Sequence, residues 1–349
     1  MTRHPLLLYV KCDLLSYSSD GQLVARYHKQ NLYFEKEFDT PHPPEIITFD
    51  TPFGGTFGLF TCFDILFHEP TITLVEKGVR QLIFPTAWMN ALPLLDSIQF
   101  QWAFSLGANV TLLAANTRND QLRMTGSGIY TPFSATYHHA KKGDPEEGRL
   151  LVARVPVLEN GVVRKESKSS PAADSEYCHQ DSCSDSAVSP SSPTCISSMM
   201  SDPFTFDLLN DTRGNLTVCN GTFCCHLQYQ QLSQGNSKEL YALGAFAGNH
   251  KGKTGFALQV CALVRCAGSN ISSCGQEVEA AETKIVFVLE GKFGTRYVYP
   301  SILVSNLVLE QPEQLEKTES GRVTMKHSNM TGGLVTACLY GRMYHLDNE

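Results

Sequence analysis

A lysine and a cysteine early in the chain have the residue types and surroundings of a catalytic pair. Lys29 stands in Tyr-His-Lys-Gln-Asn-Leu after a strand-like run, and Cys62 stands in Phe-Thr-Cys-Phe-Asp-Ile before an amphipathic stretch. A cysteine at a strand-to-helix turn has the free N–H groups of the helix start behind it, which favours the thiolate. A nearby ammonium supports that thiolate and then the oxyanion of a tetrahedral intermediate. The pair predicts attack of Cys62 on a carbonyl carbon, with the N–H of Phe63 as a second oxyanion donor.

Each of these residues also has a plainer interpretation. An isolated lysine is usually a solvated surface residue, and a free cysteine is usually a buried core residue. The local contexts of Lys29 and Cys62 together favour the catalytic interpretation. Trp88 and Met89, in Phe-Pro-Thr-Ala-Trp-Met-Asn, are candidates for a substrate pocket. Their alternative is a core role, which is common for aromatic and thioether side chains.

The segments around the pair alternate in type, which predicts an α/β domain. The strand-like runs are residues 23–27, 46–49, 57–61, 81–84 and 110–115. The helix-like stretches are residues 64–78 and 94–106. Further strands are expected from Gly126 onward and over residues 150–155. One sheet layer backed by helices fits this order.

The chain changes character after about residue 160. Residues 161–200 are rich in Ser, Pro and Asp, which predicts a polar linker that contains cysteines. From residue 201 to residue 349, short apolar runs alternate with Gly, Asn and Ser clusters, which predicts a mostly β domain. We therefore expect a first domain over residues 1–160, the linker, and a second domain over residues 201–349.

Cysteines and glycosylation sequons gather in the second half. Ten of the 12 cysteines follow residue 177. Five sequons beyond residue 200 are candidate glycosylation sites, namely Asn210, Asn215, Asn220, Asn270 and Asn329. A sixth, Asn109, opens an apolar run and is expected to be buried and unmodified. Together these features predict disulfides and a secreted protein. Zinc ligation is the alternative for the cysteines, but histidines at finger-like spacing are missing.

Composition limits the other partners. The net charge of −7 comes without a basic run, so the sequence offers no electrostatic grip on nucleic acid or on anionic lipid. We expect no nucleic-acid partner, no membrane span, no metal and no cofactor, and the sequence does not indicate an oligomeric state. Residues 1–10 hold too few apolar residues for a signal peptide, so we expect the chain to lack the N-terminal segment that would carry one.

Several motifs resemble the nitrilase superfamily, and specifically its secreted biotinidase and pantetheinase (vanin) branch. The motifs are the two around Lys29 and Cys62, Phe-Pro-Thr-Ala-Trp-Met-Asn and Met-Thr-Gly-Ser-Gly-Ile, and the resemblance continues beyond Lys238 to the end of the chain. It implies an N-terminally truncated nitrilase-type α-β-β-α sandwich followed by the branch's C-terminal β domain. It also implies that Cys62 is the nucleophile, that Lys29 is the catalytic lysine, and that Trp88 and Met89 line the substrate pocket.

The resemblance implies an amidohydrolase that acts on linear carbon–nitrogen bonds through a cysteine thioester. The small-molecule substrate would be a biotin amide such as biocytin, or else pantetheine. The stretches from Thr48 and from Trp88 favour biotin-amide hydrolysis, whereas those from Tyr27 and from Phe293 favour pantetheine hydrolysis. The final residues carry no apolar tail of the lipid-anchor kind, which favours the biotin amide.

One departure from the family pattern concerns the general base. The family completes a Glu-Lys-Cys triad with a glutamate upstream of the lysine, but residues 1–28 contain no glutamate. Glu35 and Glu69 lie downstream and do not match that position. A general base contributes about 10²- to 10⁴-fold in rate, so a catalytically impaired secreted glycoprotein is an alternative. An acyltransferase is a third, because its chemistry differs only in the last step.

Overall fold

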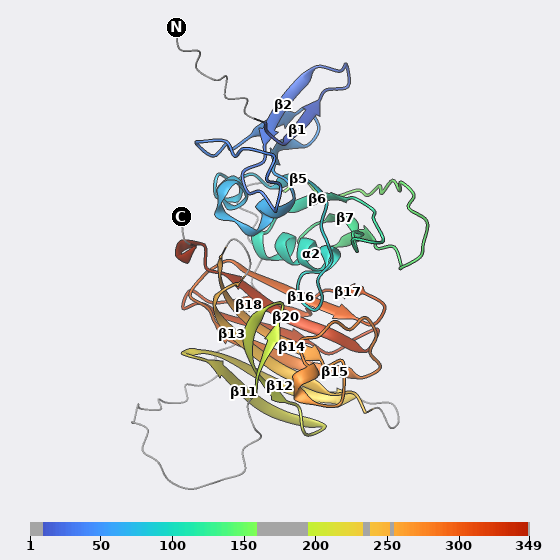
Figure 1. Cartoon of the computed structure of the whole chain (residues 1–349), viewed down its shortest axis with the longest axis vertical. Helices are drawn as coiled ribbons and strands as arrows, with labels where there is room; N and C mark the ends of the chain where they lie inside the picture. The colour runs from blue at the N-terminus through green and yellow to red at the C-terminus, as the bar shows by residue number, and fades with distance from the viewer. Residues whose placement is uncertain (1–9, 159–194, 233–237, 252–254, 348–349) are drawn as a thin grey trace.

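The described part of the chain is built mostly from β-sheets, with few helices. The computed structural model describes residues 10–158, 195–232, 238–251 and 255–347. Figure 1 shows the N-terminal sheets at one end of the molecule and the larger C-terminal sheets at the other. None of the helices in these ranges combines the length and the apolar character needed to cross a bilayer.

Two sheets make up the N-terminal region. The smaller is an antiparallel pair, β1 (Asp13–Tyr17) and β2 (Leu23–His28). The larger has six strands in chain order, β3 (Thr48–Thr51), β4 (Gly55–Leu59), β5 (Gln81–Thr86), β6 (Thr111–Asn116), β7 (Ser127–Tyr130) and β8 (Ala135–His138). Strands β4, β5 and β6 are parallel, whereas the outer pairs are antiparallel. The strands predicted from residues 23, 46, 57, 81, 110 and 126 are all present within a few residues.

The long helix that was expected over residues 64–78 is divided into short pieces. The structure has a 3₁₀ helix η1 (Cys62–Leu66), a π-helical turn η2 (His68–Ile72) and a four-residue helix α1 (Thr73–Glu76). Pro70 explains the division, because proline has no N–H to donate and forces the preceding residue out of helical geometry. Glu69 accordingly has extended backbone angles, φ −94° and ψ 127°. The prediction of one continuous helix was therefore wrong.

The main helix, α2 (Ser97–Ala108), lies between the two regions of the molecule (Figure 1). It begins at Asp96, whose side chain accepts a hydrogen bond from Ile98 N, and ends at Asn109 in the left-handed conformation. Residues 97–105 are all buried, because one side of the helix packs on the six-stranded sheet and another packs on β16 (Val298–Val304). Asn109 is exposed, contrary to the expectation that it is buried.

The strand expected over residues 150–155 does not form. These residues carry no assigned secondary structure, and Leu150 and Val152 are 87% and 80% exposed. Their run of apolar side chains fits a strand, but no ladder with another strand is recorded for them in the described residues. A strand needs a neighbour to satisfy its backbone N–H and C=O groups, so the pattern alone was insufficient.

Two antiparallel sheets form the C-terminal region. The seven-stranded sheet has the order β17 (Val308–Glu310), β16, β20 (Leu334–Arg342), β14 (Ala257–Arg265), β13 (Tyr241–Asn249), β10 (Asp202–Leu208) and β9 (Cys195–Met199). The five-stranded sheet has the order β11 (Arg213–Asn220), β12 (Phe223–Leu232), β15 (Lys284–Lys292), β19 (Arg322–His327) and β18 (Gln314–Lys317). Two 3₁₀ turns, η3 (Ile271–Ser273) and η4 (Tyr344–Leu346), complete the region.

The two C-terminal sheets share one apolar core, to which both contribute inward-facing residues. The described residues of this region contain three disulfides, Cys219–Cys224, Cys225–Cys261 and Cys266–Cys274. The second joins β12 to β14 and thus links the two sheets. These bridges confirm the prediction of disulfides for six of the later cysteines.

The remaining later cysteines either form no disulfide with another described residue or lie outside the described residues. Cys338 is buried in β20 as a free thiol, so its expected bridge is absent. Burial in an apolar strand also raises the pKa of the Cys338 thiol, as expected for an inert core cysteine. Cys195 has no bridge to another described residue. Cys178 and Cys183, with most of the predicted linker, lie outside the described residues.

Candidate active site

Lys29 lies just beyond the end of β2 in a buried position. Its side chain is 1% exposed, and its Nζ lies 2.5 and 2.6 Å from the two carboxylate oxygens of Glu35. The backbone N–H of Tyr33 donates to the same carboxylate at 2.8 Å. A buried ammonium needs such a partner, because an unpaired charge is costly to remove from water. The sequence predicted no role for Glu35, which lies six positions after Lys29 in an irregular loop.

Cys62 stands at the turn that leaves the six-stranded sheet. Strand β4 ends at Leu59, and Cys62 opens η1 with a φ of +50°, a region that residues with a side chain seldom occupy. A strained turn of this kind holds a nucleophile away from the sheet and into a cavity. Thr61 fixes the turn, because its Oγ1 donates to the carbonyl of Pro85 in β5 at 2.7 Å.

Asp64 connects the turn at Cys62 with the chain that follows Lys29. Its buried carboxylate accepts hydrogen bonds from Thr61 N at 3.0 Å and from Asn31 N at 2.8 Å. It also accepts one from the hydroxyl of Tyr27, the last buried residue of β2, at 2.8 Å. Burial raises the pKa of the Asp64 carboxyl, and these hydrogen bonds oppose that shift. One carboxylate therefore fixes both segments of the predicted pair.

The structure brings Lys29 and Cys62 to the same corner of the molecule without a direct bond between them. Among the hydrogen bonds of the described residues, the Lys29 ammonium is paired with Glu35, and the Cys62 thiol has no polar partner. The lining of the cavity at Cys62 includes Leu32, Tyr33 and Phe34, which follow Lys29 in the chain. The catalytic roles of Lys29, Cys62 and the Phe63 N–H stay predictions.

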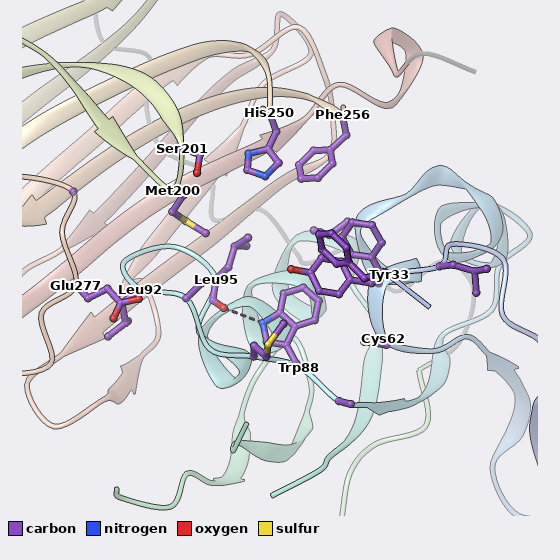
Figure 2. Close-up of a pocket in the computed structure, with 18 of the residues that line it drawn as sticks. Tyr33, Cys62, Trp88, Leu92, Leu95, Met200, Ser201, His250, Phe256 and Glu277 are labelled. Atoms are coloured by element: carbon purple, nitrogen blue, oxygen red, sulfur yellow. Dashed lines mark hydrogen bonds between the residues drawn. The ribbon is translucent and has the colours of Figure 1, made fainter. Parts of the chain in front are cut away.

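A cavity of about 510 Å³ opens beside Cys62, a size typical of small-molecule sites. Figure 2 shows that its walls come from both regions of the molecule. The N-terminal wall consists mainly of apolar side chains, among them Tyr33, Phe63, Trp88, Met89 and Leu95. The C-terminal wall consists of Met200, Ser201, His250, Phe256 and residues 275–277.

Trp88 and Met89 both lie in the cavity wall, and their surroundings differ. The Trp88 indole N–H donates to the carbonyl of Leu95 at 2.9 Å, and its ring stacks on Phe100 with 6.1 Å between centroids. The indole N–H is therefore used within the fold, and Trp88 can contribute to the cavity only through its ring. Met89 is 40% exposed and free to adapt to a ligand. Their predicted role in substrate binding stays a prediction.

Arg342, near the end of β20, joins the two walls. Its side chain is fully buried, and its Nε donates to the carbonyl of Leu66 in η1 at 2.8 Å. Its guanidinium lies over the ring of Phe256 at 4.6 Å and is paired with Asp347 at 2.5 Å. The end of the Cys62 turn and the β-domain wall are thus fixed to the same side chain. No local pattern in the sequence indicates this role.

The predicted glycosylation sites divide by exposure. Asn210, Asn215, Asn270 and Asn329 are exposed. Asn220 is half-buried, and its amide nitrogen donates to Thr205 Oγ1 at 3.1 Å while its oxygen accepts from Ala247 N at 3.3 Å. Attachment of a glycan would remove a hydrogen-bond donor that the fold uses, so Asn220 is the least suited of the five asparagines to glycosylation.

The sequence of this chain matches known proteins along most of its length. The model of the vanin C-terminal domain matches residues 194–347. A biotinidase of Takifugu rubripes is 68% identical over 335 residues, which cover 95% of this chain and 66% of that protein. A human biotinidase is 41% identical, and a mouse pantetheinase is 43% identical, each over 95% of this chain. The chain spans 63% and 62% of the length of those two proteins.

Proposed function

Because the chain belongs to the biotinidase and pantetheinase (vanin) family, we propose that it acts as an amidohydrolase on linear amides through a thioester at Cys62. The observation that carries the proposal is the position of Cys62, with a φ of +50° at the turn into η1, on the wall of a cavity of small-molecule size. The favoured substrate is a biotin amide such as biocytin, in line with the higher identity to the Takifugu biotinidase.

The proposed reaction has two halves. Cys62 Sγ attacks the amide carbonyl carbon, and the Lys29 ammonium and the Phe63 N–H stabilise the oxyanion. The carbon–nitrogen bond then breaks, the amine leaves with the proton that the Cys62 thiol has lost, and an acyl-thioester remains on Cys62. Water attacks the thioester, the carbon–sulfur bond breaks, and the carboxylic acid and the free thiol are released. Glu35 holds Lys29 in place during both halves, since it is the group that the ammonium contacts.

The proposal extends to architecture and location. Residues 1–160 would belong to a nitrilase-type α-β-β-α sandwich, residues 161–200 to a linker, and residues 201–349 to the vanin-type β domain. The six-stranded sheet with α2 on one face is consistent with one half of such a sandwich. Three disulfides support secretion into an oxidising compartment. The exposed sequon asparagines would then carry glycans.

Two other candidates each rest on a specific observation. Pantetheine hydrolysis, giving pantothenate and cysteamine, is supported by the similarity to the mouse pantetheinase. A secreted glycoprotein of impaired activity is supported by the pairing of Lys29 with Glu35 and by the lack of a polar partner for the Cys62 thiol among the described residues. Both alternatives keep the same fold and the same cavity.

The test is incubation of the purified chain with biocytin and with pantetheine, followed by mass spectrometry of the Cys62 peptide. A biotinyl adduct on Cys62 together with free biotin supports the first proposal, whereas a pantothenoyl adduct supports the second. The Cys62→Ala variant is expected to form neither adduct, and Cys12→Ala, which removes another half-buried thiol, serves as the control. Release of biotin at the wild-type rate by Cys62→Ala would contradict the mechanism. An adduct that forms but is not released indicates the impaired form.

A further inference from the structure

His250 is held in one orientation on the C-terminal wall of the cavity. It follows β13, and its ring Nδ1 lies 2.8 Å from Asp202 Oδ2 at the start of β10. The other Asp202 oxygen accepts the N–H of Lys251 at 2.9 Å, and the Asp202 side chain is 3% exposed. The imidazole also stacks on Phe256 with 4.8 Å between centroids. Both the position and the rotation of the ring are therefore fixed.

This arrangement defines which nitrogen remains for a ligand. A carboxylate accepts hydrogen bonds, so the pair with Asp202 places the proton on Nδ1 and leaves the Nε2 lone pair as an acceptor. In the described residues, Nε2 of His250 has no hydrogen-bond partner, although His250 belongs to the lining of the cavity. A polar atom of fixed direction in a largely apolar cavity is the type of group that orients a bound molecule.

The imidazole and the nucleophile stand on different walls. Figure 2 shows His250 with Phe256 and Ser201 on the β-domain side, and Cys62 on the opposite side beyond Tyr33 and Trp88. A substrate whose amide lies at Cys62 therefore reaches the histidine with a distant part of its structure. A structural histidine that only ties the turn after β13 to β10 would not need its second nitrogen in this wall.

We propose that His250, oriented by Asp202, is a specificity-determining residue through which the C-terminal β domain binds the far end of the acyl group. Resting on the proposed hydrolase function, this inference names the class of acyl group, which carries an N–H or O–H donor remote from the scissile amide. Nε2 accepts the hydrogen bond from that donor. The ureido N–H groups of a biotinyl chain and the hydroxyls of a pantothenoyl chain both belong to this class.

The experiment measures binding without turnover. Alkylation of Cys62 by iodoacetamide is followed by mass spectrometry of its peptide, with Cys12 as an internal reference thiol, in the absence and presence of biotin or pantothenate. At least one acid is expected to protect Cys62 in the wild-type chain. His250→Ala is expected to weaken this protection about tenfold, the effect of losing one hydrogen bond in a dry site, and to leave unprotected alkylation unchanged.

Further variants separate recognition from folding. His250→Gln can donate its amide to Asp202 and keep an oxygen as acceptor, so it is expected to retain part of the protection even if His250→Ala is less stable. Asp202→Asn is expected to weaken protection because it no longer fixes the proton on Nδ1. His226→Ala, an exposed histidine on β12 that pairs with Thr217, is the matched control and should behave as wild type.

The results that would overturn the role of His250 differ from those that would overturn the proposed hydrolase function. Equal protection in wild type and His250→Ala, or no protection of the wild-type chain by either acid at millimolar concentration, would overturn the role of His250. Loss of protection in His226→Ala to the same extent would do so as well. The hydrolase chemistry is judged separately, by the thioester on Cys62.

Discussion

The two walls of the cavity are held in place by different kinds of interaction. Behind the N-terminal wall, buried charged groups do the positioning: Lys29 is paired with Glu35, and Asp64 accepts hydrogen bonds from the segment of residues 27–31 and from Thr61. On the C-terminal wall, long antiparallel strands and the Cys225–Cys261 bridge provide the support. The first arrangement suits groups that must stabilise charge during a reaction, whereas the second suits a rigid surface that binds a substrate.

This difference has a consequence for stability. Buried charges in irregular loops depend on every partner being present, because removal of one leaves the other uncompensated. A sheet pair with a shared apolar core and disulfides tolerates single losses better, since each contact carries a small share. We therefore expect a single substitution in the first wall to disrupt the site and its chemistry, whereas a single substitution in the second wall should lower stability and leave the site intact. Arg342 should affect both.

The largest effect is expected from Arg342→Met. This change leaves Asp347 without its buried partner and releases the carbonyl of Leu66, so we expect a loss of about 3–5 kcal/mol in unfolding free energy. The two tryptophans, Trp88 and Trp102, both lie in the N-terminal region, so their fluorescence reports that region alone. We expect the fluorescence transition in urea to separate from the far-UV circular dichroism transition of the sheets.

The control for this prediction is Arg322→Met. Arg322 forms an ion pair with Glu290 on the exposed edge of the five-stranded sheet, and its side chain is 58% exposed. We expect a loss below about 1 kcal/mol. Coincident transitions in Arg342→Met, with stability equal to that of Arg322→Met, would show that the two walls are not joined through Arg342.

The next effect concerns chemistry on the N-terminal wall. Lys29→Met keeps the length of the side chain and removes the ammonium, so formation of the Cys62 thioester is expected to slow about 10²- to 10³-fold, as for the loss of an oxyanion donor. The rate is measured by quenched mass spectrometry of the Cys62 peptide. Lys36→Met, at an exposed lysine in the same loop, should keep the wild-type rate. Equal rates of thioester formation in the two variants would show that Lys29 takes no part in the reaction.

A smaller effect is expected from the bridge between the C-terminal sheets. Replacing Cys225 and Cys261 by alanine opens a loop with a sequence separation of 36 and should cost about 2–4 kcal/mol. The matched pair Cys219 and Cys224 has a separation of 5 and should cost less. Hydrogen exchange is expected to rise in β12 and β14 but not in β5 and β6. Equal exchange increases in both sheets would contradict the contrast between the walls.

Local patterns in the sequence predicted the elements that carry the nucleophile. The runs before Cys62 and Trp88 form β4 and β5, and the turn at Cys62 lies where the change from strand to helix was expected. These features depend on neighbouring residues, so periodicity and residue type were sufficient. The break at Pro70 also has a local signal, because a proline inside a helix-like stretch interrupts the helix.

The rest of the site depends on contacts between distant segments. Glu35 has no periodic relation to Lys29, and Asp202 can orient His250 at the cavity only because β10 and β13 are adjacent in the folded sheet. The sequence between Leu150 and Val155 shows the opposite error, because its apolar run fits a strand but no partner strand is recorded in the described residues. Pairing is a property of the fold, so residue pattern alone could not decide either case.

The smallest effect is expected from a buried hydrogen-bonded pair away from the cavity, in which Glu310 Oε2 and His327 Nε2 are 2.6 Å apart. Burial alone would raise the pKa of the Glu310 carboxyl, but hydrogen bonds from His327 and Thr331 hold this pKa below its ordinary value of 4.5. A carboxyl with a lowered pKa stabilises the folded state at any pH above its ordinary pKa, and this stability is lost as the pH falls through the pKa of the folded state.

Glu310→Gln should therefore lower the Tm near neutral pH by the equivalent of about 1 kcal/mol, and the difference from wild type should shrink in acid below pH 4.5. Glu316→Gln, at an exposed position, should show no such dependence. A constant difference across the acid range would mean that this pair, unlike Lys29 and Glu35, acts through packing and not through charge.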